Sequence, residues 1–169
     1  MGDPGDDVPE HPALADELRA ELLGRGMTLA TAESLTGGHL AELVSAPPGA
    51  SETYVGGVVS YATRVKVTVL GVGEGTVEEH GVVSEQCARE MAEGVRTLLG
   101  SDWGVSTTGV AGPTTQEGKP VGTVFLAVAG PAGTTAQERH FEGDRAAIRA
   151  QASVTAVRLV LQQLAGGRR

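Results

Sequence analysis

The sequence Met27-Thr-Leu-Ala-Thr-Ala-Glu-Ser-Leu-Thr-Gly-Gly38 decides the fold class, because its hydrophobic pattern changes in the middle. Residues 27–32 are a short apolar and β-branched run, which predicts a strand. Residues 34–46 carry apolar side chains at helical spacing, and Pro47-Pro48 ends that pattern. A strand, a tight turn and a helix therefore follow one another, which is typical of α/β proteins.

The same order of elements continues along the chain. Residues 55–61 predict a second strand. Residues 62–70 predict a helix, although their β-branched side chains make the helical pattern weaker. Residues 84–99 are the clearest amphipathic helix. The other expected elements are a helix from Pro12 to the glycines at 24 and 26, strands over 103–108, 123–129 and 134–141, and a helix over 145–164 capped by Asp144. Together they predict a three-layer α/β/α sandwich on a mixed, mostly parallel sheet.

Composition excludes several classes of protein. The 169 residues hold 13 Lys and Arg against 21 Asp and Glu, a formal net charge of −8, whereas nucleic-acid binding needs a basic surface. No apolar run approaches the roughly 18 residues of a membrane-spanning helix, so a soluble, cytoplasmic protein is expected. The single cysteine, Cys87, lies in an apolar, helical stretch and is expected to be structural.

One domain is expected over residues 12–166. Residues 1–11 are acidic and contain prolines, a composition typical of a flexible tail. A chain of this length can bury enough apolar surface to fold without disulfides or metals.

Familiar catalytic motifs fail on spacing. Five residues separate Gly112 from Gly118-Lys119 where a phosphate-binding P-loop has four, and Pro120 stands where that loop needs Ser or Thr. Ser34 lacks the flanking glycines of a nucleophile elbow. The four histidines are far apart in sequence and no cysteine pair accompanies them. Neither a metal nor another cofactor is expected.

Ser34 lies where the first strand meets its helix, and its hydroxyl has two interpretations. It can cap the helix by accepting a backbone N–H group. Alternatively, it is a nucleophile at a helix N-terminus, where N–H groups and the helix dipole stabilise a phosphate or a developing oxyanion. Gly37 and Gly38 would then let a ligand approach the backbone.

A serine nucleophile needs a base, and the candidates are Tyr61 and Lys66 after the second strand. Lysine acts as a base only when neutral, which partial burial and positive charge from Arg64 or Arg145 would favour. The two side chains converge only if Tyr61 ends the strand and Lys66 lies in the following helix, as the pattern predicts. The alternative is a solvated lysine with a core tyrosine.

Two further segments complete the candidate site. Residues 106–113 are a small-residue strand end that fits an ordinary turn or a pocket wall. Residues 141–149 begin the last helix with Arg145 and Arg149, which suit a phosphate or carboxylate. Arg149 equally fits a surface position.

In this order and spacing, the segments resemble the CinA C-terminal domain family, the bacterial nicotinamide mononucleotide amidohydrolases. The resemblance extends from about residue 14 to residue 164. It rests on AESLTGG (32–38), GGVVSYATRVKVTVLGV (56–72), STTGVAGP (106–113), GKPVGTVFLA (118–127) and FEGDR (141–145).

The resemblance implies a metal-independent hydrolase of pyridine nucleotide recycling. It would convert the carboxamide of nicotinamide mononucleotide to the acid and release ammonia. On the matching positions, Ser34 would be the nucleophile, Lys66 its general base and Tyr61 the hydroxyl that assists proton transfer. The implied substrate-binding residues are Thr36, Gly37, Gly38, Thr108, Gly109, Ala111, Gly112 and Arg145.

Partners also follow from this resemblance. The ligand would be an anionic mononucleotide, for which Lys66, Arg145 and Lys119 would make the pocket locally positive. A homodimer is expected from the resemblance and from the apolar C-terminal helix. Relatives are often fused to an N-terminal molybdopterin-binding-like domain, whereas this chain resembles the stand-alone form.

Two positions depart from the family pattern, and two other functions remain open. Leu35 stands where the family often has cysteine, and Thr114-Thr115 replace a glycine-rich run, which would alter pocket shape and substrate choice. One alternative is a non-catalytic nucleotide-binding or regulatory module. The other is an amidase for a different small pyridine or nucleotide carboxamide.

Overall fold

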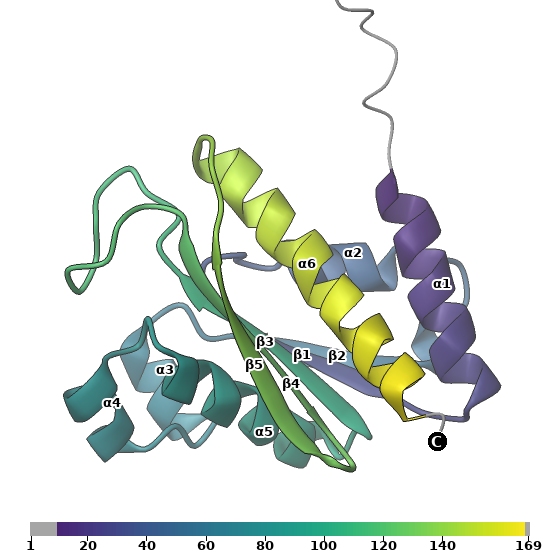
Figure 1. The fold of residues 1–169 in the computed structure, drawn as a ribbon. Coiled ribbons are helices and arrows are strands. Elements are labelled where there is room, and N and C mark those ends of the chain that lie inside the picture. Colours follow the sequence, from purple (N-terminus) through teal and green to yellow (C-terminus); the bar gives the residue numbers. More distant parts are fainter. Residues whose placement is uncertain (1–9, 168–169) are drawn as a thin grey trace, which may run out of the picture.

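A five-stranded sheet forms the centre of the computed structural model, which describes residues 10–167 (Figure 1). The strands are β1 (Leu29–Glu33), β2 (Tyr54–Val59), β3 (Trp103–Gly109), β4 (Thr123–Gly130) and β5 (Gly133–His140). Their spatial order is β2-β1-β3-β4-β5. β1 pairs in parallel with β2 and β3, whereas β4 is antiparallel to β3 and β5. Since only β4 opposes the other strands, the predicted mixed, mostly parallel sheet is confirmed.

Helices cover both faces of this sheet (Figure 1). They are α1 (Glu10–Gly24), α2 (His39–Ser45), the short 3₁₀ helix η1 (Ala50–Glu52), α3 (Thr63–Thr68), α4 (Glu74–His80), α5 (Glu85–Leu99) and α6 (Arg145–Gly166). α1, α2 and α6 pack on one face, and α3, α4 and α5 lie on the other. This is the three-layer α/β/α sandwich expected from the sequence. No helix within residues 10–167 combines the length and hydropathy that crossing a bilayer requires.

The strands divide the hydrophobic core into two halves. Successive side chains of a strand point to opposite faces, so Leu126 of β4 packs with the α1, α2 and α6 layer while Ala127 packs with α5. The apolar side of α6 also lies in this core, where Ile148 and Val157 are buried. A homodimer, which the apolar pattern of this helix predicts, would therefore need another surface.

The hydrophobic spacing predicts a helix from Ser34, but helix α2 begins at His39. The buried carboxylate of Glu33 explains the difference. It accepts hydrogen bonds from the backbone N–H groups of Gly38, Leu40 and Ala41, at 3.2, 2.8 and 3.2 Å. These bonds satisfy N–H groups that the first turn of a helix leaves free. The residues between Ser34 and Gly38 therefore form a turn.

Helix α4 and η1 were not predicted, because each is short and α4 is mostly polar. The start of α4 depends on a distant partner. Glu90 of α5 accepts hydrogen bonds from the N–H group of Gly73, at 2.7 Å, and from the hydroxyl of Thr76, at 2.6 Å. The predicted tail over residues 1–11 lies outside the described residues, except that Glu10 and His11 belong to α1.

The close contact of α5 with Leu70 gives a stability prediction. A Cβ atom added at Gly94 would overlap the backbone carbonyl of Leu70. We expect Gly94→Ala to lower the free energy of unfolding by roughly 1–3 kcal/mol through overpacking, although alanine is the better helix former. Gly75→Ala in α4 is the control, because nothing lies within 4 Å of its added Cβ, and it should stabilise by about 0.5–1 kcal/mol. Urea denaturation measures both, and equal stabilisation by the two substitutions would contradict the close contact.

Candidate active site

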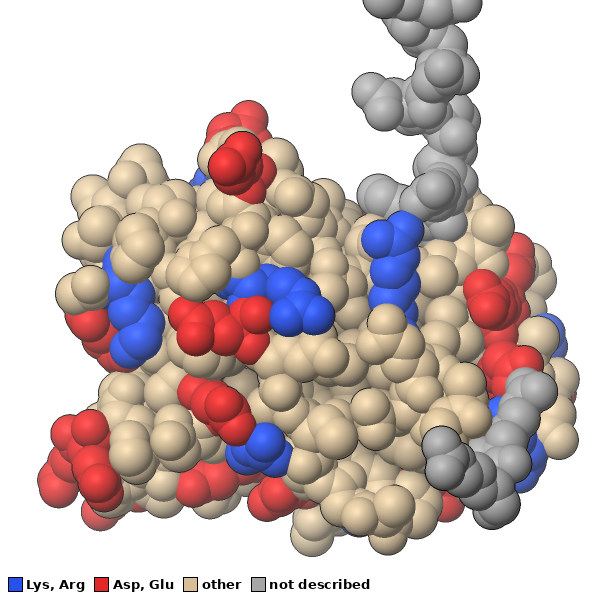
Figure 2. Space-filling model, viewed as in Figure 1, with Lys and Arg blue, Asp and Glu red and all other residues tan. Residues whose placement is uncertain are grey.

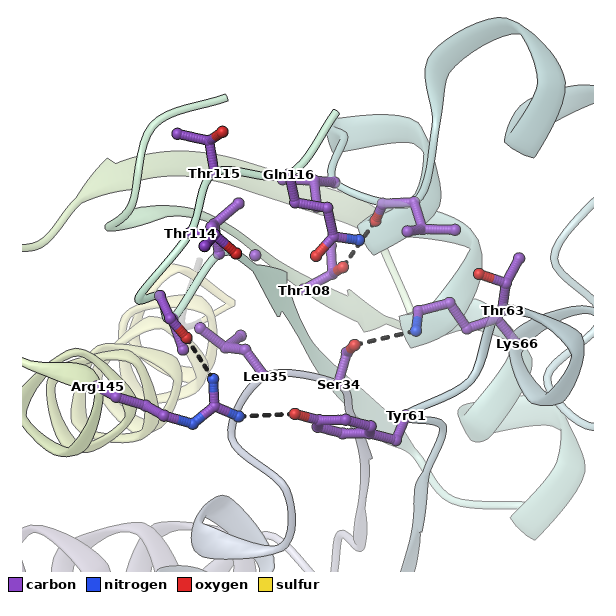
Figure 3. A pocket seen from close by; sticks show the side chains of 16 residues that line it. Ser34, Leu35, Tyr61, Thr63, Lys66, Thr108, Thr114, Thr115, Gln116 and Arg145 are labelled. Carbon is purple, nitrogen blue, oxygen red and sulfur yellow. Dashed lines mark hydrogen bonds between the residues drawn. The ribbon is translucent and has the colours of Figure 1, made fainter. Parts of the chain in front are cut away.

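A pocket of about 320 Å³ opens where β1, β2 and β3 end. Carboxyl ends of parallel strands share one edge of a sheet, which is where α/β proteins bind ligands. The lining residues are Ser34, Leu35, Tyr61, Thr63, Lys66, Val82, Val83, Thr108, Gly109, Val110, Ala111, Gly112, Thr114, Thr115, Gln116 and Arg145. Figure 3 shows Ser34, Lys66, Tyr61 and Arg145 around this one space. The structure therefore brings together the three residues predicted to be catalytic.

Ser34 and Lys66 are in direct contact. Lys66 Nζ lies 3.0 Å from Ser34 Oγ and donates a second hydrogen bond of 2.6 Å to the carbonyl oxygen of Ser60. The Ser60 carbonyl thus fixes the direction of the amine. As predicted, Lys66 lies in the helix that follows the second strand. Tyr61 was expected to end that strand, but β2 ends at Val59, so Tyr61 lies in the connection to α3.

The lysine is buried, with 1% of its surface exposed. Burial lowers the pKa of Lys66, while the nearby Cys87 and Glu117 groups oppose this shift. The expected contribution of positive charge from Arg64 or Arg145 is not among the causes of this shift, of which burial is the largest. Tyr61 is 61% exposed, so the alternative of a solvated lysine and a core tyrosine is wrong for both residues.

The turn after β1 holds Ser34 without using it as a cap. The cap position of α2 is Gly38, which makes no side-chain cap hydrogen bond. The Thr36 hydroxyl is buried between Glu33, at 2.7 Å, and Thr107, at 2.8 Å. Ser34 therefore does not cap the helix, and as a candidate nucleophile it lies in the turn before α2, because Glu33 already occupies that helix N-terminus.

Three of the expected substrate-binding residues lie outside the pocket. Thr36, Gly37 and Gly38 are absent from its lining, and the Thr36 carbonyl accepts a hydrogen bond of 2.9 Å from Arg149 Nη2 behind the turn. Gly37 and Gly38 have φ angles of 55° and 104°, which glycine adopts readily. Their place in the structure is to let the turn form.

The other expected substrate-binding residues do line the pocket: Thr108, Gly109, Ala111, Gly112 and Arg145. Arg145 connects two walls of it. Its guanidinium donates to the Tyr61 hydroxyl and to the Gly112 carbonyl, both at 2.7 Å. The Thr108 hydroxyl donates to the Val82 carbonyl at 2.7 Å, which attaches the wall after β3 to the segment before α5.

The charge of the pocket is opposite to that of the chain. Arg145 supplies a positive charge to the lining and Lys66 adds a second one only while it is protonated, whereas no Asp or Glu among residues 10–167 lines the pocket. On the face drawn in Figure 2, acidic and basic side chains are interspersed. A locally positive pocket in a protein of net charge −8 favours an anionic ligand. Lys119, which was expected to add to this charge, does not line the pocket.

Several residues of the site carried no signal in the sequence. Val82 and Val83 line the pocket, but two valines before a helix do not indicate a binding site in the sequence. Glu33 lies inside the quoted motif, yet nothing in the pattern shows that it is buried. Cys87 is buried as predicted, and burial raises the pKa of its thiol to about 11, so it remains a protonated core side chain.

Comparisons with known proteins agree with the sequence resemblance. A CinA-like protein of Frankia casuarinae is 50% identical over 155 residues, which cover 89% of this chain and 36% of the relative. A CinA-like protein of Anaeromyxobacter sp. is 51% identical over 158 residues, which cover 92% of this chain and 38% of the relative. The chain thus spans little more than a third of the length of these two curated relatives.

Solved structures match the chain over nearly their whole length. A competence-damaged protein (CinA) superfamily protein from Klebsiella pneumoniae has a TM-score of 0.91 at 36% identity, covering 94% of this chain and 99% of its own. One from Escherichia coli has a TM-score of 0.90 at 32% identity, covering 93% and 92%. The family model of the CinA C-terminal domain matches residues 11–164. The chain therefore belongs to the CinA C-terminal domain family.

Proposed function

We propose that this protein is an amidohydrolase that deamidates nicotinamide mononucleotide to nicotinate mononucleotide and ammonia. The observation that carries the proposal is the 3.0 Å contact between Ser34 Oγ and the buried amine of Lys66. A hydroxyl becomes a useful nucleophile when an adjacent base takes its proton. Lys66 is suited to that role because burial disfavours its charged form.

The first half of the reaction forms an acyl-enzyme. Neutral Lys66 accepts the Ser34 proton as Oγ attacks the carboxamide carbon, giving a tetrahedral intermediate. The C–N bond then breaks, and the leaving nitrogen takes a proton from Lys66 and departs as ammonia. The Tyr61 hydroxyl, which faces the same space, assists this transfer.

The second half releases the acid. Water attacks the acyl carbon while Lys66 accepts its proton, and the C–O bond to Ser34 breaks. The proton returns to Ser34 Oγ, so the enzyme is regenerated. The Ser60 carbonyl, at 2.6 Å from Nζ, keeps the amine directed at the serine throughout both steps.

The charge of the pocket supports a phosphorylated substrate. Arg145 lies at the rim and has a planar guanidinium that suits phosphate oxygens. In the absence of substrate it donates to Tyr61 and Gly112. A substrate phosphate that binds Arg145 would contact the wall opposite the Ser34 and Lys66 pair.

The proposed pair gives the first activity prediction. Ser34→Ala and Lys66→Met should each lower ammonia release from nicotinamide mononucleotide by roughly 10³-fold or more. Lys66→Met should unfold at or above the native temperature, because methionine is buried without the desolvation penalty of an amine. Ser51→Ala and Lys119→Met are the matched controls, since neither residue lines the pocket.

Two outcomes would redirect the assignment. Full activity in either Ser34→Ala or Lys66→Met would remove the pair from the mechanism. If the native protein releases no ammonia but the substrate raises the melting temperatures of the native protein and of Ser34→Ala, the non-catalytic binding module is favoured.

The buried amine also predicts the pH dependence. Because the base must be neutral, kcat/KM should rise with pH as Lys66 loses its proton. Burial lowers the pKa of Lys66, so the rise should be centred below about pH 10.4, the ordinary value for lysine. A pH–rate profile measures this, with circular dichroism at each pH to exclude unfolding. A rise centred above the ordinary lysine value would contradict the assignment.

Arg145 predicts how the substrate is chosen. Arg145→Met should lower kcat/KM for nicotinamide mononucleotide by roughly 10- to 100-fold, the magnitude of a lost charge-assisted hydrogen bond. Its effect on nicotinamide riboside, which lacks the phosphate, should be much smaller. Arg139→Met on β5 is the control. An equal loss on both substrates would show that Arg145 does not bind the phosphate, and would favour an amidase for another carboxamide.

A further inference from the structure

The loop between β3 and β4 forms a wall of the pocket but has few attachments. Thr114, Thr115 and Gln116 line the pocket, although residues 113–118 are exposed. Gln116 and Lys119 exchange backbone hydrogen bonds of 2.9 and 3.3 Å within the loop. These bonds shape the loop without attaching it to the rest of the chain.

Glu117 provides that attachment. Its Oε1 accepts a hydrogen bond of 2.9 Å from the N–H group of Val82, and its Oε2 accepts one of 3.0 Å from Val83. Val82 and Val83 are themselves part of the pocket wall. Within residues 10–167, no other side chain of the 113–121 loop is hydrogen-bonded to the rest of the chain. One carboxylate therefore holds two walls together.

The backbone of Glu117 has an unfavourable conformation that allows its side chain to make this contact. Its φ angle is 52°, and it is the one non-glycine residue with positive φ in the described part of the chain. Such a conformation is unfavourable for a side chain as large as glutamate and persists where surrounding contacts hold it. Opposite it stands Gly81, where an added Cβ would overlap the Glu117 carboxylate.

We propose that Glu117 is a positioning residue that latches the 113–121 loop to the segment before α5 and so closes the pocket over the mononucleotide. The identity of that ligand rests on the proposed function. The exposed loop can open when the two hydrogen bonds break, and the bonds re-form once the ligand is inside. Glu117 then sets affinity without touching the reacting atoms.

Glu117 also affects the electrostatics of the base. The Ser34 hydroxyl and the Ser60 carbonyl contact the amine of Lys66, and the Cys87 and Glu117 groups lie near enough to raise its pKa against the effect of burial. The negative charge of Glu117 favours protonated Lys66. Removing that charge should therefore shift the rise of kcat/KM with pH toward lower pH, a change that a loss of packing alone would not produce.

The test compares Glu117→Gln and Glu117→Gly with the native protein. The glutamine removes the charge and keeps the size, whereas the glycine removes the carboxylate and also relieves the strained φ angle. Glu138→Gln on β5 is the control for the loss of one negative charge. Amide hydrogen exchange at Val82 and Val83 measures the latch directly, and steady-state kinetics and calorimetry with nicotinamide mononucleotide measure its effect on the ligand.

We expect both amides to exchange roughly tenfold faster in Glu117→Gly, which loses both hydrogen bonds, and at least one of them to do so in Glu117→Gln, whose single amide oxygen can accept from only one N–H group. KM should rise by a similar factor, and the pH profile should shift downward in both. Unchanged exchange at Val82 and Val83 in Glu117→Gly would overturn the latch. Faster exchange with unchanged KM would overturn its role in closing the pocket.

A failure of the proposed function gives a different pattern. If the native protein binds nicotinamide mononucleotide but releases no ammonia, the amidase assignment fails. The affinity measured by calorimetry then replaces KM: unchanged exchange in Glu117→Gly would still overturn the latch, and faster exchange with unchanged affinity would overturn its role in closing the pocket. If the native protein neither binds nor deamidates it, both the function and the closure over this ligand are overturned.

Discussion

The carboxylate of Glu33 is the constraint on which the candidate site depends. It ends β1 inside the sheet and accepts the N–H groups that start α2. Because the Glu33 carboxylate accepts hydrogen bonds from those N–H groups, the residues between the strand and the helix need not cap the helix and can form a turn. Ser34 is the first residue of that turn and is directed at the pocket.

A buried lysine is the second constraint, and it opposes stability. Placing an amine in the core disfavours its charged form, and within residues 10–167 only Ser34 and Ser60 lie within hydrogen-bond distance of Nζ. The desolvation penalty falls at Lys66, where the proposed reaction needs a neutral amine. Groups with a perturbed pKa that lie in a cleft are typical of functional sites, and Lys66 meets both conditions.

Local sequence predicted most of the fold and the centre of the site. The strand before Ser34, the strand before Tyr61 and the helix that carries Lys66 follow from periodicity within short windows, although β2 ends at Val59 and not at Tyr61 as predicted. The start of α2 could not be predicted this way, since it depends on a glutamate that the pattern does not show to be buried. The contacts of Glu90 with α4 and of Glu117 with Val82 and Val83 join segments far apart in sequence. Thr36, Gly37 and Gly38 were expected to bind substrate but do not line the pocket. A motif does not reveal which of its members face a ligand.

The two halves of the chain contribute unequally to the pocket. Ser34, Tyr61 and Lys66 all lie on the β1–α2 and β2–α3 connections, whereas Thr108, the 113–121 loop and Arg145 come from later segments. On the proposed function, reactivity and ligand choice would be encoded in separate stretches of the sequence. The later loops could then change and admit new substrates while the same reacting pair is kept, so that recognition would diverge faster than chemistry. Engineering of this scaffold would begin in the second half of the chain.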